Sequence, residues 1–197
     1  MPTSRTNASP LKRGFRADAE RKSLFYRQEL GLKKHDPLPA LTLADHLKIR
    51  VLSPAEIPGI TPDLLELLLE TGKDVWSAAF FVRDEHKFII HNTTHSSHRQ
   101  ESNLMHEIAH CICGHELMDL ETALANCVLP LRKYNDEQEA EAECLGACLQ
   151  LPQPALFHYF HILKKSPEEI SQIFNASKQM VNYRLSVSGV KKIKWNR

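Results

Sequence analysis

Apolar residues recur at helical spacing in the middle of the chain. Between residues 97 and 114 they are Leu104, Met105, Ile108, Ala109 and Ile112. Ser97 followed three residues later by Gln100 fits a capping box at the start of a helix, and Gly114 fits a residue that ends one. The pattern therefore predicts one amphipathic helix between Ser97 and Gly114.

A second helix is predicted between Pro130 and Pro152, which bound a segment rich in acidic and apolar residues. Asn135 suits the N-cap, and the acidic residues that follow it suit a first turn, where the helix dipole favours negative charge. Leu145, Cys148 and Leu149 stand four, seven and eight positions after Glu141. Glu141 therefore belongs to the apolar stripe that faces the interior.

The rest of the chain up to residue 91 predicts short helices and strands. Helices are expected over residues 15–31, 41–47 and 61–69, and strands over residues 49–52, 75–82 and 87–91. A turn at Asp84-Glu85 would make the last two strands an antiparallel hairpin. Two or three strands beside a helix indicate a small α+β fold. We expect an edge strand of such a sheet to align an extended peptide.

The C-terminal residues predict two further helices joined by a short turn. Ser166, Pro167 and Glu169 are typical of a helix start, and Ser177 suits the N-cap of a second helix. Beyond Glu169 there is no acidic residue, and the basic residues are Lys178, Arg184, Lys191, Lys192, Lys194 and Arg197. This helix-turn-helix-like segment indicates either a DNA-binding module or a helical pair packed on the core, and we favour the second interpretation.

Composition limits the class of protein. The 197 residues are 42% hydrophobic with a net charge of +1, which suits one core with a small appendage and does not indicate a polyanionic partner. We predict an N-terminal arm without order over residues 1–13, a first domain over residues 14–155 and a helical segment over residues 156–197. No run of eighteen apolar residues and no secretory signal is present, so no membrane span is expected. Five cysteines without an export signal favour a reducing, cytoplasmic location.

The first predicted helix carries the motif His-Glu-Ile-Ala-His at residues 106–110. Residues four apart lie on the same face of a helix, so His106 and His110 can direct two imidazole nitrogens at one zinc ion. Glu107 lies beside that face, where its carboxylate can take a proton from a water as a general base. The motif predicts two metal ligands and one catalytic residue.

A third ligand is expected from the acidic helix, because catalytic zinc sites usually have three protein ligands. We predict Glu141, since a carboxylate on a buried stripe is costly unless something neutralises it. Glu139 points more toward the other face, and Glu137 lies in the first turn, so both remain alternatives. Two histidines and a carboxylate accept zinc, and manganese is the alternative metal.

With these residues in place, the chain resembles the ImmA/IrrE family of metallopeptidases. Residues 106–115, which read HEIAHCICGH, resemble the active-site helix of that family, and Glu141-Ala142 followed by residues 149–152 is similar to its second signature. Ala109 replaces a glycine that is more usual in the family. The resemblance implies a zincin-like core and zinc-dependent endoproteolysis. It also implies a substrate, a helix-turn-helix repressor whose cleavage switches on stress-response or mobile-element genes.

Some roles stay open in the sequence. Tyr134, His98 and His95 are candidates for a residue that stabilises the oxyanion. His115 is five residues past His110, about 140° around the helix, so we expect it to bond a neighbouring segment rather than the metal. Two other functions remain: a DNA-binding regulator with a structural metal, and a repressor-binding partner that holds its target without cutting it.

Overall fold

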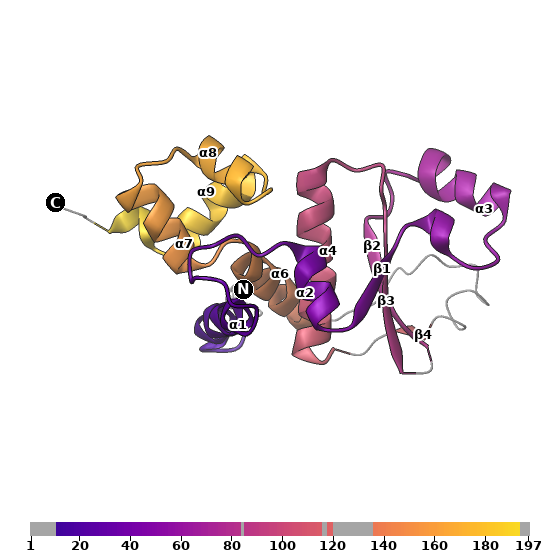
Figure 1. The fold of residues 1–197 in the computed structure, drawn as a ribbon, viewed down its shortest axis with the longest axis horizontal. Helices are drawn as coiled ribbons and strands as arrows, with labels where there is room; N and C mark the ends of the chain where they lie inside the picture. The colour runs from indigo at the N-terminus through magenta and orange to yellow at the C-terminus, as the bar shows by residue number, and fades with distance from the viewer. Residues whose placement is uncertain (1–10, 84, 116–117, 120–135, 194–197) are drawn as a thin grey trace, which may run out of the picture.

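A computed structural model describes residues 11–83, 85–115, 118–119 and 136–193. Figure 1 shows a sheet at one end of the molecule, the C-terminal helices at the other, and α4 (Ser97–Cys113) and α6 (Asp136–Gln150) between them. The helix α1 (Phe15–Glu29) packs against α6, and α2 (Ala40–His46) against α4. The mixed α+β fold that the sequence predicts is confirmed, and it is consistent with a small zincin-like domain.

The sheet has four strands in the order β1-β3-β2-β4. They are β1 (Ile49–Leu52), β2 (Ala78–Arg83), β3 (His86–His91) and β4 (Met118–Asp119). β2 and β3 form the predicted antiparallel hairpin, in which Phe80 lies opposite Ile89, while β1 runs parallel to β3 and β4 parallel to β2. β4 was not predicted, because a pairing of two residues leaves no period in the sequence. α3 (Pro62–Glu66) and the π-helical turn after it lie beyond the sheet (Figure 1).

The helix α4 begins one residue away from the predicted cap. Its N-cap is Ser96 rather than Ser97, and no side chain caps the helix. Gln100 does not complete a capping box, because its Nε2 donates to the carbonyl oxygens of Thr93 and His95 in the preceding turn. Gly114 ends the helix in the left-handed region with φ 70°, as predicted.

The helix α6 approaches α4 closely through a glycine. A Cβ on Gly146 would lie 3.1 Å from the carbonyl oxygen of Met105 and 3.3 Å from the Cα of His106. On its other side, α6 is tied to α1 by Arg27, which is buried and donates to the carbonyl oxygen of Leu149 at 2.9 Å. The predicted N-cap, Asn135, lies outside the described residues.

The described residues form two principal hydrophobic clusters. The larger lies between the sheet, α4, α6 and α1, and includes Phe80, Ile89, Met105, Ile108 and Leu145. The smaller begins at Leu151 and is built from α7 (Gln153–Phe157), α8 (Pro167–Ile173) and α9 (Lys178–Val187). The domain limits at residues 13 and 155 stay predictions, and residues 1–10 of the expected arm lie outside the described part.

The two predicted C-terminal helices are present with the expected caps. The Ser166 hydroxyl accepts from the backbone N–H of Glu169, the Glu169 carboxylate accepts from the N–H of Ser166, and Ser177 caps α9. Among the described residues, no helix is both long and apolar enough to cross a membrane.

Candidate metal centre

Two imidazoles meet on one face of α4. His106 and His110 stand one helical turn apart, and their Nε2 atoms lie 3.0 Å from each other. His110 is fully buried, whereas the side chain of His106 is 28% exposed. The histidine pair of the motif therefore converges on one point at the edge of the helix, with one side toward solvent.

A carboxylate from α6 completes the group. One oxygen of Glu139 lies 3.4 Å from the Nε2 of His106, and the other lies 3.5 Å from the Nε2 of His110. Ligands held about 2.0–2.1 Å from a zinc ion in a tetrahedron lie roughly 3.3 Å from one another. The separations of 3.0, 3.4 and 3.5 Å are close to this value, although the last two end on different oxygens of Glu139. The three side chains can therefore converge on one tetrahedral zinc ion.

The predicted ligand Glu141 lies in a different contact. It is buried on the inward stripe of α6, as expected, and its Oε2 lies 3.0 Å from the Nε2 of His115. The Nδ1 of His115 lies 2.9 Å from the Nδ1 of His110. His115 thus bonds a neighbouring segment, as predicted, while the role of Glu141 as a metal ligand stays a prediction that this geometry does not favour over Glu139.

A metal bound to His110 would fix the protons along the contacts from His110 through His115 to Glu141. If the Nε2 of His110 binds a metal, that atom must offer its lone pair, so the Nδ1 of His110 carries the proton and donates to the Nδ1 of His115. The Nε2 of His115 then carries a proton and donates to the carboxylate of Glu141. Such outer contacts fix the tautomer and the ring orientation of a metal-binding histidine.

Glu137, the other alternative ligand, pairs with the N-terminal segment. The Nζ of Lys12 lies 2.9 Å from the Oε1 of Glu137 and 3.7 Å from the Oε1 of Glu141. The hydrogen bond from Lys12 to Glu137 raises the pKa of the exposed lysine. Lys12 therefore adds a positive charge beside the two carboxylates that do not contact the histidine pair.

A second group of possible ligands lies deeper between the same helices. Cys113, His115 and Glu141 have ligand atoms within 4.8 Å of one another. Burial raises the pKa of the Cys113 thiol to about 11, so a metal bound here would have to displace the thiol proton. Because His115 and Glu141 also hold His110 in place, we assign this group to the support of the metal centre.

The structure does not assign a catalytic role to the remaining predicted residues. Glu107 follows the first histidine and is 8% exposed, and its role as a general base stays a prediction. His98 lies eight residues before His106, about 12 Å along the helix, and the His95 ring lies 3.1 Å from the carbonyl oxygen of Lys73. Tyr134 lies outside the described residues. No oxyanion-stabilising residue is therefore assigned among the described positions.

Sequence reasoning ranked the two carboxylates by burial and so placed Glu139 behind Glu141. The side chain of Glu139 is 43% exposed, and that of Glu141 is 11% exposed. A helical period shows which carboxylate is buried. It does not show which turn of α6 lies opposite the histidines of α4. The spacing of His106 and His110 along α4 contains no information on where α6 crosses that helix.

Comparison with known proteins identifies the family of the chain. No curated protein and no solved structure matches it significantly. Residues 67–186, more than half of the chain, match the model of the IrrE N-terminal-like domain, Peptidase_M78. The matched residues include the histidine pair, both carboxylates and nearly all of α9. The chain therefore belongs to the IrrE N-terminal-like family, Peptidase_M78, a family of zinc-dependent peptidases.

Proposed function

We propose that this protein is a zinc-dependent endopeptidase in which His106, His110 and Glu139 hold the metal and Glu107 is the general base. The observation that carries the proposal is the convergence of two Nε2 atoms and one carboxylate at tetrahedral ligand separations. Three protein ligands leave a fourth position for water or substrate. A structural site usually has four ligands and is rich in cysteine, so this donor set supports a catalytic site.

Each residue of the centre has a distinct task in peptide hydrolysis. When bound, zinc supplies Lewis-acid polarisation of the scissile carbonyl and of the attacking water. The carboxylate of Glu107 takes the proton as that water attacks, and then donates it to the departing amine. His115 and Glu141 keep the Nε2 of His110 deprotonated toward the metal and hold its ring in place.

We propose a helix-turn-helix repressor as the substrate, whose cleavage would derepress stress-response or mobile-element genes. Membership of the IrrE N-terminal-like family supports this substrate class. A direct DNA-binding role for α9 has less support. Lys178 pairs with Glu168 at 2.9 Å, and the nearly buried Arg184 pairs with Glu20 at 2.6 Å, so two of the basic residues are engaged within the protein.

The decisive test compares the wild-type chain with Glu107→Gln. Both proteins are purified, loaded with zinc and measured for bound metal. They are then expressed in matched cells, and new protein N-termini are compared by mass spectrometry. We expect one zinc per chain in both, new N-termini in a DNA-binding repressor with the wild type only, and a loss of cleavage of roughly 10²- to 10⁴-fold in the variant.

The same experiment separates the peptidase from its alternatives. A chain that binds zinc and a repressor but leaves it intact would be a non-cleaving partner. Cleavage that survives in Glu107→Gln would remove this residue from the mechanism. Loading with manganese in place of zinc, followed by the same cleavage assay on the repressor found, identifies the metal that supports activity.

A further inference from the structure

A cavity of about 450 Å³ lies between α4, α6 and α9, and His106 forms part of its wall. We propose that this cavity receives the substrate side chain next to the scissile bond and selects a long cationic one, lysine or arginine. This inference rests on the proposed peptidase function. It goes beyond that function because it names the residue that the enzyme recognises and gives the C-terminal helices a role in recognition.

The walls of the cavity suit a long methylene chain. α6 contributes the small residues Gly146 and Ala147, and α9 contributes Met180 and Tyr183. The Tyr183 side chain is 51% exposed and is not part of the C-terminal cluster. An apolar thioether and an aromatic face stabilise the stem of a lysine or arginine, and the ring face also attracts the cation.

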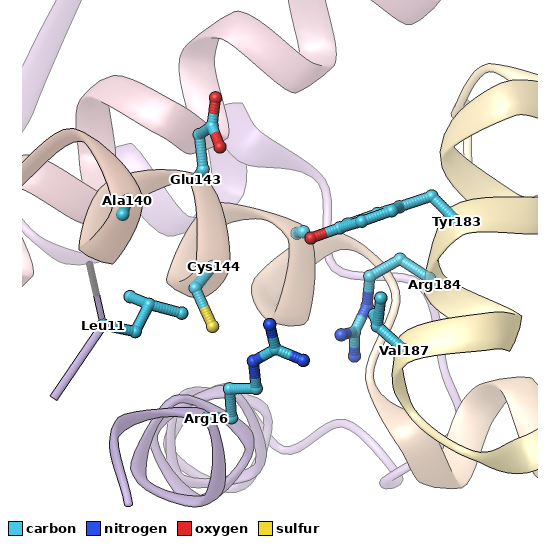
Figure 2. A pocket seen from close by; sticks show the side chains of 9 residues that line it. Leu11, Arg16, Ala140, Glu143, Cys144, Tyr183, Arg184 and Val187 are labelled. Carbon is cyan, nitrogen blue, oxygen red and sulfur yellow. The ribbon is translucent and has the colours of Figure 1, made fainter. Parts of the chain in front are cut away.

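The wall of the cavity carries one acidic side chain. Glu143 lies in its wall, is exposed, and has no ion pair with any described residue. A smaller neighbouring pocket of about 170 Å³ shares Glu143 and Tyr183 and contains Arg16 and Arg184. Figure 2 shows that the Glu143 carboxylate is directed away from both arginines. Its charge therefore remains available to a cation that enters from the side of His106.

One polar residue in the cavity wall has an unsatisfied donor. The Nδ2 of Asn103 is screened from solvent and has no hydrogen-bond partner among the described residues. Asn103 lines the cavity and stands one helical turn before His106 on α4. A donor left without a partner costs free energy, and a rotation of the Asn103 side chain toward the cavity would let it donate to a peptide carbonyl.

Two hydrogen bonds join the C-terminal helices to the metal-binding helices. The turn before α9 accepts a hydrogen bond from the Nε2 of Gln150 at the Asn175 carbonyl oxygen, 3.0 Å away. The Nδ2 of Asn175 also donates to the carbonyl oxygen of Ser97 at 3.4 Å. The residues that match the family extend to residue 186 and include both Met180 and Tyr183. The helix-turn-helix-like segment thus forms a wall of the substrate cleft.

The test measures binding without requiring cleavage. Two short peptide hydroxamates, which bind a catalytic zinc directly, carry either lysine or its uncharged analogue norleucine beside the hydroxamate. Their affinities for the zinc-loaded full chain are measured by calorimetry. We expect the lysine compound to bind about fivefold more tightly than the norleucine compound, as for an exposed ion pair. Glu143→Gln should abolish that preference, and Tyr183→Ala should weaken both compounds.

Glu29→Gln is the matched control, because Glu29 is exposed on α1 and lies outside this cavity. This variant should keep the preference for lysine. Equal affinities of the two compounds for the wild type, or a lysine preference that survives in Glu143→Gln, would overturn the proposal and leave the peptidase function intact. A chain that prefers lysine but cuts no protein would overturn the peptidase instead. A chain that binds no zinc would overturn both.

Discussion

The same two helices, with the turn that follows α4, form two groups of potential metal ligands that differ in depth. His106, His110 and Glu139 lie at the edge, where two of the three side chains are 28% and 43% exposed. Cys113, His115 and Glu141 lie below, where His115 and Glu141 are only 5% and 11% exposed. A catalytic metal must remain accessible to substrate, whereas its supporting contacts gain from burial. This difference in exposure supports the proposal that catalysis takes place at the edge and that the interior group supports it.

The largest effect is expected from changing the carboxylate of each group in turn. Glu139→Gln removes a proposed metal ligand and should lower zinc affinity by more than 100-fold. Glu141→Gln weakens an outer contact, which typically costs 10- to 100-fold. Competition with a fluorescent zinc chelator measures both affinities on the purified proteins, and Glu29→Gln should leave the affinity unchanged.

The order of these two effects decides the third ligand. If Glu141→Gln loses more affinity than Glu139→Gln, then Glu141 is the ligand that its place on the buried stripe predicted. The helix α6 would then contact the metal through its inward face, and Glu139 would be the outer contact.

The next effect concerns the histidine that joins the two groups. His115→Phe keeps a ring of similar size but removes both hydrogen bonds, one to His110 and one to Glu141. We expect zinc affinity to fall by about 10- to 100-fold. His115→Phe combined with Glu141→Gln should cost little more than His115→Phe alone, because the two residues act as one unit. If the losses of zinc affinity in the two single variants multiply in the double variant, then His115 and Glu141 do not act on His110 as one unit.

The sequence predicted the individual helices and strands better than the way in which the helices pack against one another. Helical spacing and Gly114 gave α4, and the caps at Ser166 and Ser177 gave α8 and α9, because these signals are local. The pairing of the two histidines was also local, since one turn of helix determines it. Glu139 could not be chosen, because its contact depends on how α6 crosses α4.

The cavity beside His106 was missed for the same reason. It depends on the close approach of two helices at Gly146, where a Cβ would lie 3.1 Å from Met105, and on the docking of α9 beside them. No sequence period reports a distance between helices. In the sequence, Tyr183 is distinguished only as an aromatic residue on the face of α9 that points away from the C-terminal hydrophobic cluster.

The smallest effect is expected at Cys113, and it tests whether the deeper group is a metal site of its own. Cys113→Ser keeps the size of the side chain and removes the thiol. Burial raises the pKa of this thiol to about 11, so it keeps its proton at neutral pH unless a metal displaces it. We expect one zinc per chain before and after the change, with less than a twofold change in affinity. Metal analysis that finds two zinc ions in the wild type and one in Cys113→Ser would contradict the division of the two groups. His115 would then be a ligand of a second ion, and its contact with His110 would join two metal sites rather than support one.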